Sequence, residues 1–211
     1  PVEGARYYVK YRSSPGINKK SLTFHSATVD ARKYYRLFNH ISLAGRLFYG
    51  TNWGKNAQKF RLGGVPWIFS SDSISYYNTE SITAEELYFS EYVMPVRGTT
   101  ISQKLGQNVL LINLELRLPF LIYYFPTIRY LGQINGVIFT DLGVTWEDEY
   151  LPYSKESNWE EGSTGWLMSY GLGPRFFFLG IPWQLDFAWE YNPHIGTISK
   201  RKWFLSMGLD F

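Results

Sequence analysis

The side chains that could carry out acid–base or metal chemistry are few and widely separated in this chain. The three histidines share no spacing typical of a metal site or a catalytic triad: His25, His40 and His194. Asp186 with Glu190, and Glu85 with Glu86, are more simply explained as pairs on a polar face or in a loop. Cysteine is absent, which excludes disulfides, a thiol nucleophile and thiolate metal ligands. The sequence predicts neither an enzyme nor a protein that binds a metal or cofactor.

Phosphate and nucleic-acid chemistry are disfavoured as well. Gly171-Leu-Gly173 lies inside a predicted strand and does not open a helix, so it is not a phosphate-binding loop. The net charge is only +3, and no basic cluster is interleaved with aromatic residues. The sequence therefore predicts no nucleic-acid partner.

The most regular element is the segment from Asn108 to Pro119, which alternates with a period of two residues. One face is uniformly aliphatic: Leu110, Ile112, Leu114, Leu116 and Leu118. The opposite face carries Leu111, Asn113, Glu115 and Arg117. Because successive side chains of a strand point to opposite sides, this segment is predicted to be a strand with one apolar and one polar face.

The same alternation recurs along the chain. It predicts eight antiparallel strands near residues 4–13, 21–33, 38–50, 107–119, 133–146, 164–179, 182–192 and 201–211. By the same alternation, Asp141 lies on the polar face of the strand that follows the one carrying Glu115. Between residues 51 and 106 the alternation disappears, which predicts a long loop with a helical turn near residues 83–89.

Two all-β architectures fit these strands: a soluble β-sandwich and a transmembrane β-barrel. Aromatic residues make up 19% of the chain, and Trp and Tyr occur near the ends of the apolar faces, as in interfacial girdles. Strands of about ten residues match a tilted membrane crossing. A sheet in lipid must close so that no backbone edge is left unsatisfied. These observations favour a single antiparallel transmembrane β-barrel domain over residues 1–211.

Three motifs, in this order, give the chain its resemblance to a known family. Val96-Arg97-Gly98 lies late in the long loop, Phe139-Thr-Asp141-Leu-Gly143 lies on a strand, and the last strand ends in Phe. The terminal strand carries Trp203, Leu205, Met207, Leu209 and Phe211 at alternate positions. Asp30-Ala-Arg-Lys-Tyr34 and Leu62-Gly63-Gly64 support the match. With these motifs, essentially the whole chain resembles the C-terminal half of the barrel of the BamA/TamA family, the bacterial surface antigen group of outer-membrane proteins.

The resemblance implies a barrel of sixteen strands in the bacterial outer membrane, with eight of them preceding Pro1. It implies a role in inserting or translocating proteins, without a cofactor. The implied partners are outer-membrane lipid, unfolded outer-membrane or secreted proteins, and periplasmic or lipoprotein subunits. A closed cylinder of eight strands is just filled by its own side chains. It has no room for the loop at 51–106, so a larger barrel is expected.

The resemblance also implies a lock between the loop and the barrel wall. Arg97 is expected to enter the lumen and to pair with Asp141, with Glu115 as a neighbouring acceptor, because a guanidinium matches a carboxylate bidentately. Gly98 is expected to let the backbone pass close to the wall. Arg175, which lies outside the motifs, is expected to matter less. Without the motifs, the favoured interpretation is that Arg97 is an exposed loop arginine and Asp141 a solvated strand residue.

Some features depart from the family. Thr99 stands where the family usually has an aromatic residue, and no periplasmic repeat is present in this sequence. The stretch from Gly63 to Trp67 and the long spacer to Arg97 are more similar to family barrels fused to β-propellers. Two alternatives to insertion therefore stay open: a barrel that anchors a larger surface or propeller-containing protein, and a passive porin-like channel.

Overall fold

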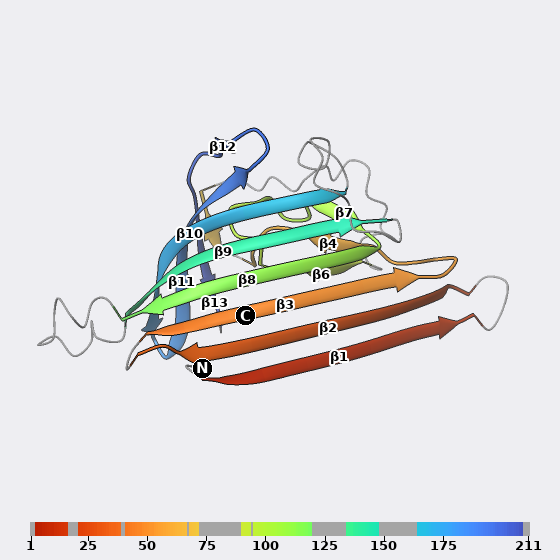
Figure 1. The fold of residues 1–211 in the computed structure, drawn as a ribbon, viewed down its shortest axis with the longest axis horizontal. Helices are drawn as coiled ribbons and strands as arrows, with labels where there is room; N and C mark the ends of the chain where they lie inside the picture. Colours follow the sequence, from red (N-terminus) through yellow and green to blue (C-terminus); the bar gives the residue numbers. More distant parts are fainter. Residues whose placement is uncertain are drawn as a thin grey trace, which may run out of the picture.

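Eight long strands form the body of the protein in a computed structural model that describes residues 3–16, 21–38, 41–66, 68–71, 90–93, 95–119, 134–147 and 164–208 (Figure 1). They are β1 (Gly4–Pro15), β2 (Thr23–Arg36), β3 (Ser42–Trp53), β8 (Asn108–Leu118), β9 (Asn135–Trp146), β10 (Gly165–Phe178), β11 (Ile181–Asn192) and β13 (Lys202–Met207). All eight predicted strands are confirmed, with ends shifted by a few residues. The all-β fold with an antiparallel sheet is therefore as expected.

The strands lie in one sheet in the order β1-β2-β3-β8-β9-β10-β11-β13-β5, and β12 (Thr197–Ile198) pairs with β11. Each long strand is antiparallel to the next long strand along the chain. Neighbours in sequence become neighbours in space because short connections cannot carry the chain far. Longer segments separate β3 from β8, β8 from β9 and β9 from β10, and each of these pairs is still adjacent in the sheet.

Alternation places the two kinds of side chain on opposite faces, as predicted. On β8, Leu114 is 45% exposed, whereas Glu115 is only 1% exposed. We call the face that carries Leu114 the outer face and the face that carries Glu115 the inner face. In Figure 1 the sheet curves around three short strands that lie against this inner face.

Those short strands belong to the insert, which comprises residues 54–107 between β3 and β8. β4 (Phe60–Leu62) is the middle strand of a small sheet, flanked by β6 (Glu91–Val93) and β7 (Lys104–Gly106). The predicted loop boundary at residue 51 was wrong, because Thr51 pairs with Asn108 and β3 continues to Trp53. The prediction of a loop without strands was also wrong, whereas the helical turn predicted at 83–89 lies outside the described residues.

The core lies between the insert and the inner face. One cluster joins apolar side chains of the insert to those of β3, β8 and β10: Phe48, Phe60, Leu62, Val93, Val96, Val109, Leu111 and Leu167. A second cluster joins the insert to β9, β11 and β13: Val65, Val137, Phe139, Ala188 and Phe204. Apolar side chains of the inner face thus provide two clusters on which the insert packs.

The sheet does not close into a cylinder within the described residues. The second edge of β13 is occupied by β5 (Phe69–Ser70), where Ile68 N donates to Leu205 O at 2.8 Å and Ser71 N donates to Trp203 O at 3.0 Å. β1 pairs with β2 alone among the described strands. The sealed eight-strand cylinder that would have excluded a larger barrel is therefore not found. Within the same residues, no helix is long and apolar enough to cross a membrane.

Candidate functional site

Arg97 binds Asp141 of β9 through its side chain and its backbone at once. Nε donates to Asp141 Oδ2 at 2.8 Å, and Nη2 donates to Asp141 Oδ1 at 2.7 Å. The backbone N–H of Arg97 donates to Asp141 Oδ2 at 2.9 Å. This is the bidentate geometry in which a guanidinium holds a carboxylate most specifically. The pairing of Arg97 with Asp141 in the structure is as the motifs predict.

Glu115 of β8 accepts a hydrogen bond from the remaining branch of the same guanidinium. Arg97 Nη1 donates to Glu115 Oε1 at 2.5 Å. Arg117 approaches the other oxygen of this carboxylate, with Nη2 at 3.0 Å from Glu115 Oε2. Arg97 thus connects the insert to two neighbouring strands, and each of its three nitrogens has a carboxylate oxygen as acceptor.

Asn113 completes the polar site and was not singled out in the sequence. Its Nδ2 donates to Asp141 Oδ1 and to the carbonyl oxygen of Pro95, both at 2.8 Å. Asn113 lies two residues before Glu115, so the same alternation that turned Glu115 inward could have identified it. Asn113 thus holds Pro95, two residues before Arg97, against the inner face of the sheet.

The ring of Phe139 lies against the flat face of the Arg97 guanidinium. The Cζ atom of Arg97 lies 3.7 Å from the centre of the Phe139 ring, within range of a cation–π interaction. Phe139 and Asp141 are two residues apart on β9 and therefore point to the same face. One strand motif supplies both the anion and the ring that Arg97 contacts.

The charges of this site are removed from water. The side chain of Arg97 is 3% exposed, and those of Glu115 and Asp141 are 1% and 0% exposed. Burial alone would lower the pKa of Arg97, but the charges of Asp141 and Glu115 outweigh burial and raise it, so the guanidinium remains charged. A buried charge network of this kind holds only while every partner is present.

Gly98 lies directly against β11. Its φ is +86°, and a Cβ atom built on it would lie 3.1 Å from Ala188 Cβ and 3.3 Å from the backbone of Trp189. Glycine adopts this conformation without steric cost, whereas a Cβ atom here would be strained by the backbone and would lie unusually close to β11. The close backbone approach predicted for Gly98 is confirmed.

Thr99 connects two segments of the insert, one around Gly64 and the other around Val96. Its hydroxyl donates to Val96 O at 2.6 Å and accepts from the backbone N–H of Gly64 at 2.9 Å. Val96 N in turn donates to Gly64 O at 2.9 Å. The threonine that departs from the family pattern thus closes the tip of the insert with hydrogen bonds. Gly64 has a φ of +79° and fits against Ile101, where a Cβ atom would lie 2.6 Å away.

Two further contacts fix the insert to the wall. Leu62 of β4 packs on Gly143, where a Cβ atom would lie 2.8 Å from Leu62 Cδ2. Gln103 Nε2 donates to Glu190 Oε1 of β11 at 2.7 Å. The glycine of the Phe-x-Asp-x-Gly motif therefore provides space for the insert. Sequence reasoning had included Gly143 without assigning this contact.

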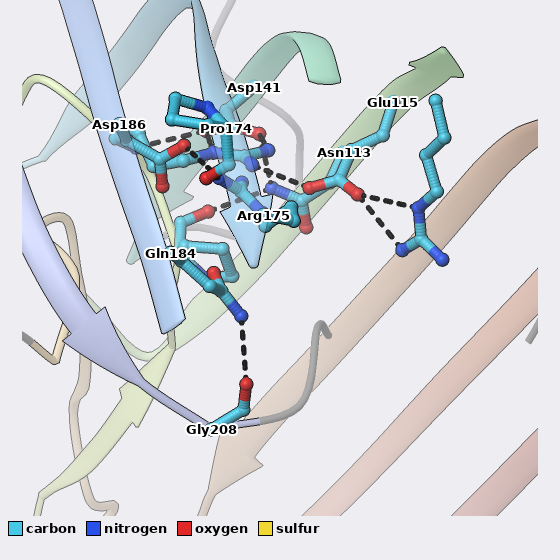
Figure 2. Close-up of polar contacts among 11 residues, drawn as sticks. Asn113, Glu115, Asp141, Pro174, Arg175, Gln184, Asp186 and Gly208 are labelled. Atoms are coloured by element: carbon cyan, nitrogen blue, oxygen red, sulfur yellow. Dashed lines mark hydrogen bonds and ion pairs between the residues drawn. The ribbon is translucent and has the colours of Figure 1, made fainter. Parts of the chain in front are cut away.

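Arg175 is nearer to this site than the sequence suggested. Its Nη1 lies 2.7 Å from Asp186 Oδ1, and the two side chains are 10% and 4% exposed. Figure 2 shows this pair beside Asp141, Asn113 and Glu115. Arg175 thus lies outside the motifs but close to the lock, and its expected smaller effect on substitution stays a prediction. Parity placed Arg175 and Asp186 on the inner face, but sheet curvature decides how close they come to Glu115.

The terminal motif is described in part. Trp203, Leu205 and Met207 lie on the outer face of β13, in register with Phe187, Leu185 and Trp183 of β11. Leu209 and Phe211 lie outside the described residues. The parts of the motif that are described belong to the outer face of the sheet and not to the lock.

The arrangement around Arg97 is suited to holding the insert in place. Over the described ranges, no group of three or more His, Cys, Asp or Glu side chains could hold a metal ion. The backbone N–H and all three guanidinium nitrogens of Arg97 donate to the carboxylates of Asp141 and Glu115. No protein-family model matches this sequence and no curated protein matches it, so its likeness to the BamA/TamA family rests on the motifs and their order.

Proposed function

We propose that this chain is the C-terminal part of an outer-membrane β-barrel of the BamA/TamA type that inserts or translocates proteins at the outer membrane. The observation that carries the proposal is the lock, in which Arg97 of an insert on the inner face binds Asp141 and Glu115 of two adjacent strands. The insert would occupy the lumen, and the outer face would contact lipid. The remaining strands of a sixteen-strand barrel would precede β1.

The outer face supports a location in the membrane. Aromatic rings gather where the strands meet the longer connections, and there His25 stacks between Tyr11 and Trp53 with ring centroids 6.3 and 5.5 Å away. The opposite ends carry a second set of aromatic residues: Tyr35, Phe176, Phe178 and Trp183. Aliphatic residues predominate between the two sets. This is the pattern of a lipid-facing barrel wall with two interfacial girdles.

The packing of the insert favours a barrel whose lumen is occupied by the insert over a passive, open channel. A porin-like lumen is polar and filled with water. Here Phe60, Leu62 and Val93 of the insert are at most 2% exposed, because they pack on apolar residues of the inner face. Displacing the insert from the inner face would break both the apolar core and the buried ion-pair network. Such a displacement would therefore cost a large amount of free energy.

The lock gives this half of the barrel a rigid wall. Arg97 joins β8 and β9, Gly98 rests on β11, and Gln103 adds a second contact to β11. In the proposed mechanism, rigid strands on this side hold the insert while client polypeptide is handled elsewhere in the barrel. A static anchor would also use a rigid wall, so rigidity alone does not distinguish an anchor from a protein that inserts or translocates other proteins.

The test is depletion of the full-length protein in its native bacterium, with rescue by variants. Insertion or translocation predicts that outer-membrane or secreted proteins accumulate unfolded in the periplasm after depletion. Wild-type protein restores them, whereas Arg97→Ala restores them poorly. Arg201→Ala serves as a control, because Arg201 lies outside the lock, with its guanidinium 5.6 Å from the Phe187 ring centre. Normal levels of client proteins, with loss of only a domain linked to this chain, would replace the proposal with an anchor.

A further inference from the structure

Lys33 is unusual because it carries a charge on the outer face. Pairing places Lys33 between Ala5 of β1 and Gly45 of β3, on the same face as Leu114. At the outward positions of the eight described long strands, it is the one residue among Asp, Glu, Lys and Arg. Its Nζ lies 5.0 Å from the centre of the Tyr35 ring, and no carboxylate of a described residue forms an ion pair with it.

A groove of about 310 Å³ opens beside Lys33 on this face. Ala31 and Gly45 form its floor, because these two neighbouring positions carry the smallest side chains on β2 and β3 here. Bulkier residues form its sides: Tyr7, Tyr35, Leu47 and Leu114. The groove is thus apolar along its length, with the Lys33 ammonium group and two tyrosines among its lining side chains. Arg32 and Arg46 also line it, but they lie at inner-face positions, and their guanidinium groups bind Asp30.

The position of Lys33 along the strand fits a membrane interface. It lies three residues before the end of β2 at Arg36, which is about 10 Å along an extended chain. A lysine at that depth can extend its ammonium group toward the headgroups while its methylenes stay on apolar surface. A lysine at the midplane would be far more costly.

We propose that this groove binds one glycerophospholipid, with an acyl chain over Ala31 and Gly45 and the headgroup phosphate paired with Lys33. The inference rests on the proposed membrane location of the outer face. Charge complementarity selects a lipid with an anionic headgroup, and the size of the groove suits a single chain. Tyr7 and Tyr35 provide hydroxyl groups near that headgroup.

Two variants separate the parts of the site without disturbing the fold. Gly45→Leu fills the floor, and its Cβ atom would meet only Leu114 Cδ2, at an ordinary contact distance of 3.5 Å. Lys33→Gln removes the charge and keeps the length of the side chain. Ala27→Leu is the control for added bulk on the outer face of β2, and Lys10→Gln is the control for a lysine lost from the inner side of β1.

The experiment is native mass spectrometry of the full-length protein in mild detergent, with phosphatidylglycerol or phosphatidylcholine added. We expect one retained phosphatidylglycerol, with Lys33→Gln weakening retention roughly fivefold, toward that of phosphatidylcholine. Gly45→Leu should abolish retention of both lipids, and the two controls should retain them. Equal retention by all variants, equal loss in Ala27→Leu, or displacement by inorganic phosphate alone would overturn the site.

A separate measurement distinguishes failure of the groove from failure of the membrane location. The wild-type protein is folded into lipid vesicles, and integration is followed by protease protection. Integration without any retained lipid rejects the groove and leaves the barrel proposal in place. Failure of the full-length protein to integrate rejects both.

Discussion

At the scale of single residues, Arg97 is the side chain whose substitution should destabilise the protein most. Its guanidinium binds Asp141 and Glu115, and it lies flat on Phe139. Lysine would keep the charge but would lack the planar fork that reaches both carboxylates. The site therefore depends on the shape of arginine as well as on its charge.

Arg97→Ala should lower the free energy of unfolding by about 3–5 kcal/mol, because it leaves the buried carboxylate of Asp141 without its ion-pair partner and leaves Glu115 with Arg117 alone. A double-mutant cycle with Asp141→Ala, measured by urea unfolding in detergent or lipid, should give strongly non-additive losses. Arg97→Lys should recover only part of the stability, and Arg201→Ala should have little effect. Additive losses would show that Arg97 and Asp141 do not act as a pair.

Thr99→Val should destabilise the insert by about 1–3 kcal/mol, because Gly64 N–H and Val96 O would each lose a buried partner. Valine keeps the shape of threonine, so the change isolates the hydroxyl. Limited proteolysis of the folded protein should show faster cleavage within the insert. Thr99→Ser should remain resistant, and equal resistance of Thr99→Val would exclude a structural role for the hydroxyl.

At the scale of elements, the insert and the sheet fit together where wall glycines meet bulky insert residues. Leu62 of β4 packs on Gly143 of β9, and Phe60 packs on Gly50 of β3. The glycines leave hollows in the inner face, and the side chains of β4 fill them. This fit positions the small sheet so that Arg97 can reach its carboxylates.

Gly143→Ala should displace β4, because the new methyl group would lie 2.8 Å from Leu62 Cδ2. Adding Leu62→Ala to the same chain should restore the position of the insert by removing the clashing atoms. Protease resistance of the insert and hydrogen exchange of β4 report on this directly. If Leu62→Ala fails to rescue Gly143→Ala, the defect arises in β9 itself and not in the docking of the insert.

At the scale of the whole molecule, the outer face determines the solvent to which this sheet is adapted. Leu142 lies in the middle part of the face, in register with Ile112 of β8, whereas Leu118 is the last residue of β8. A soluble sheet with an exposed apolar face would accept a charge equally at either position. A sheet that faces lipid would not, because the cost of a charge depends on its depth.

Leu142→Arg should destabilise the full-length protein in lipid vesicles by about 2–4 kcal/mol, and Leu118→Arg by about 0–1 kcal/mol. Urea titration of the vesicle-folded protein measures both values. In the pair of variants the added side chain is the same, so depth is the main difference. Similar values at the two positions would contradict a lipid-facing wall.

The local pattern of the sequence determined most of the sheet. A period of two residues identifies each long strand and assigns its faces, because alternation is a property of the extended backbone itself. It was therefore sufficient to turn Glu115 and Asp141 toward one face and Leu114 toward the other. It could not detect β4, β6 and β7, since each has only three residues and shows no period.

The motifs predicted that Arg97 meets Asp141, but only the tertiary structure decided the other contacts of the insert and the inner face. Thr99 reaches Gly64 across 35 residues of sequence. Arg175 comes to lie beside the lock, although no motif includes it. Such contacts depend on strand register, on the curvature of the sheet and on the path of the insert. These arise from packing between distant segments and leave no periodic trace in the chain.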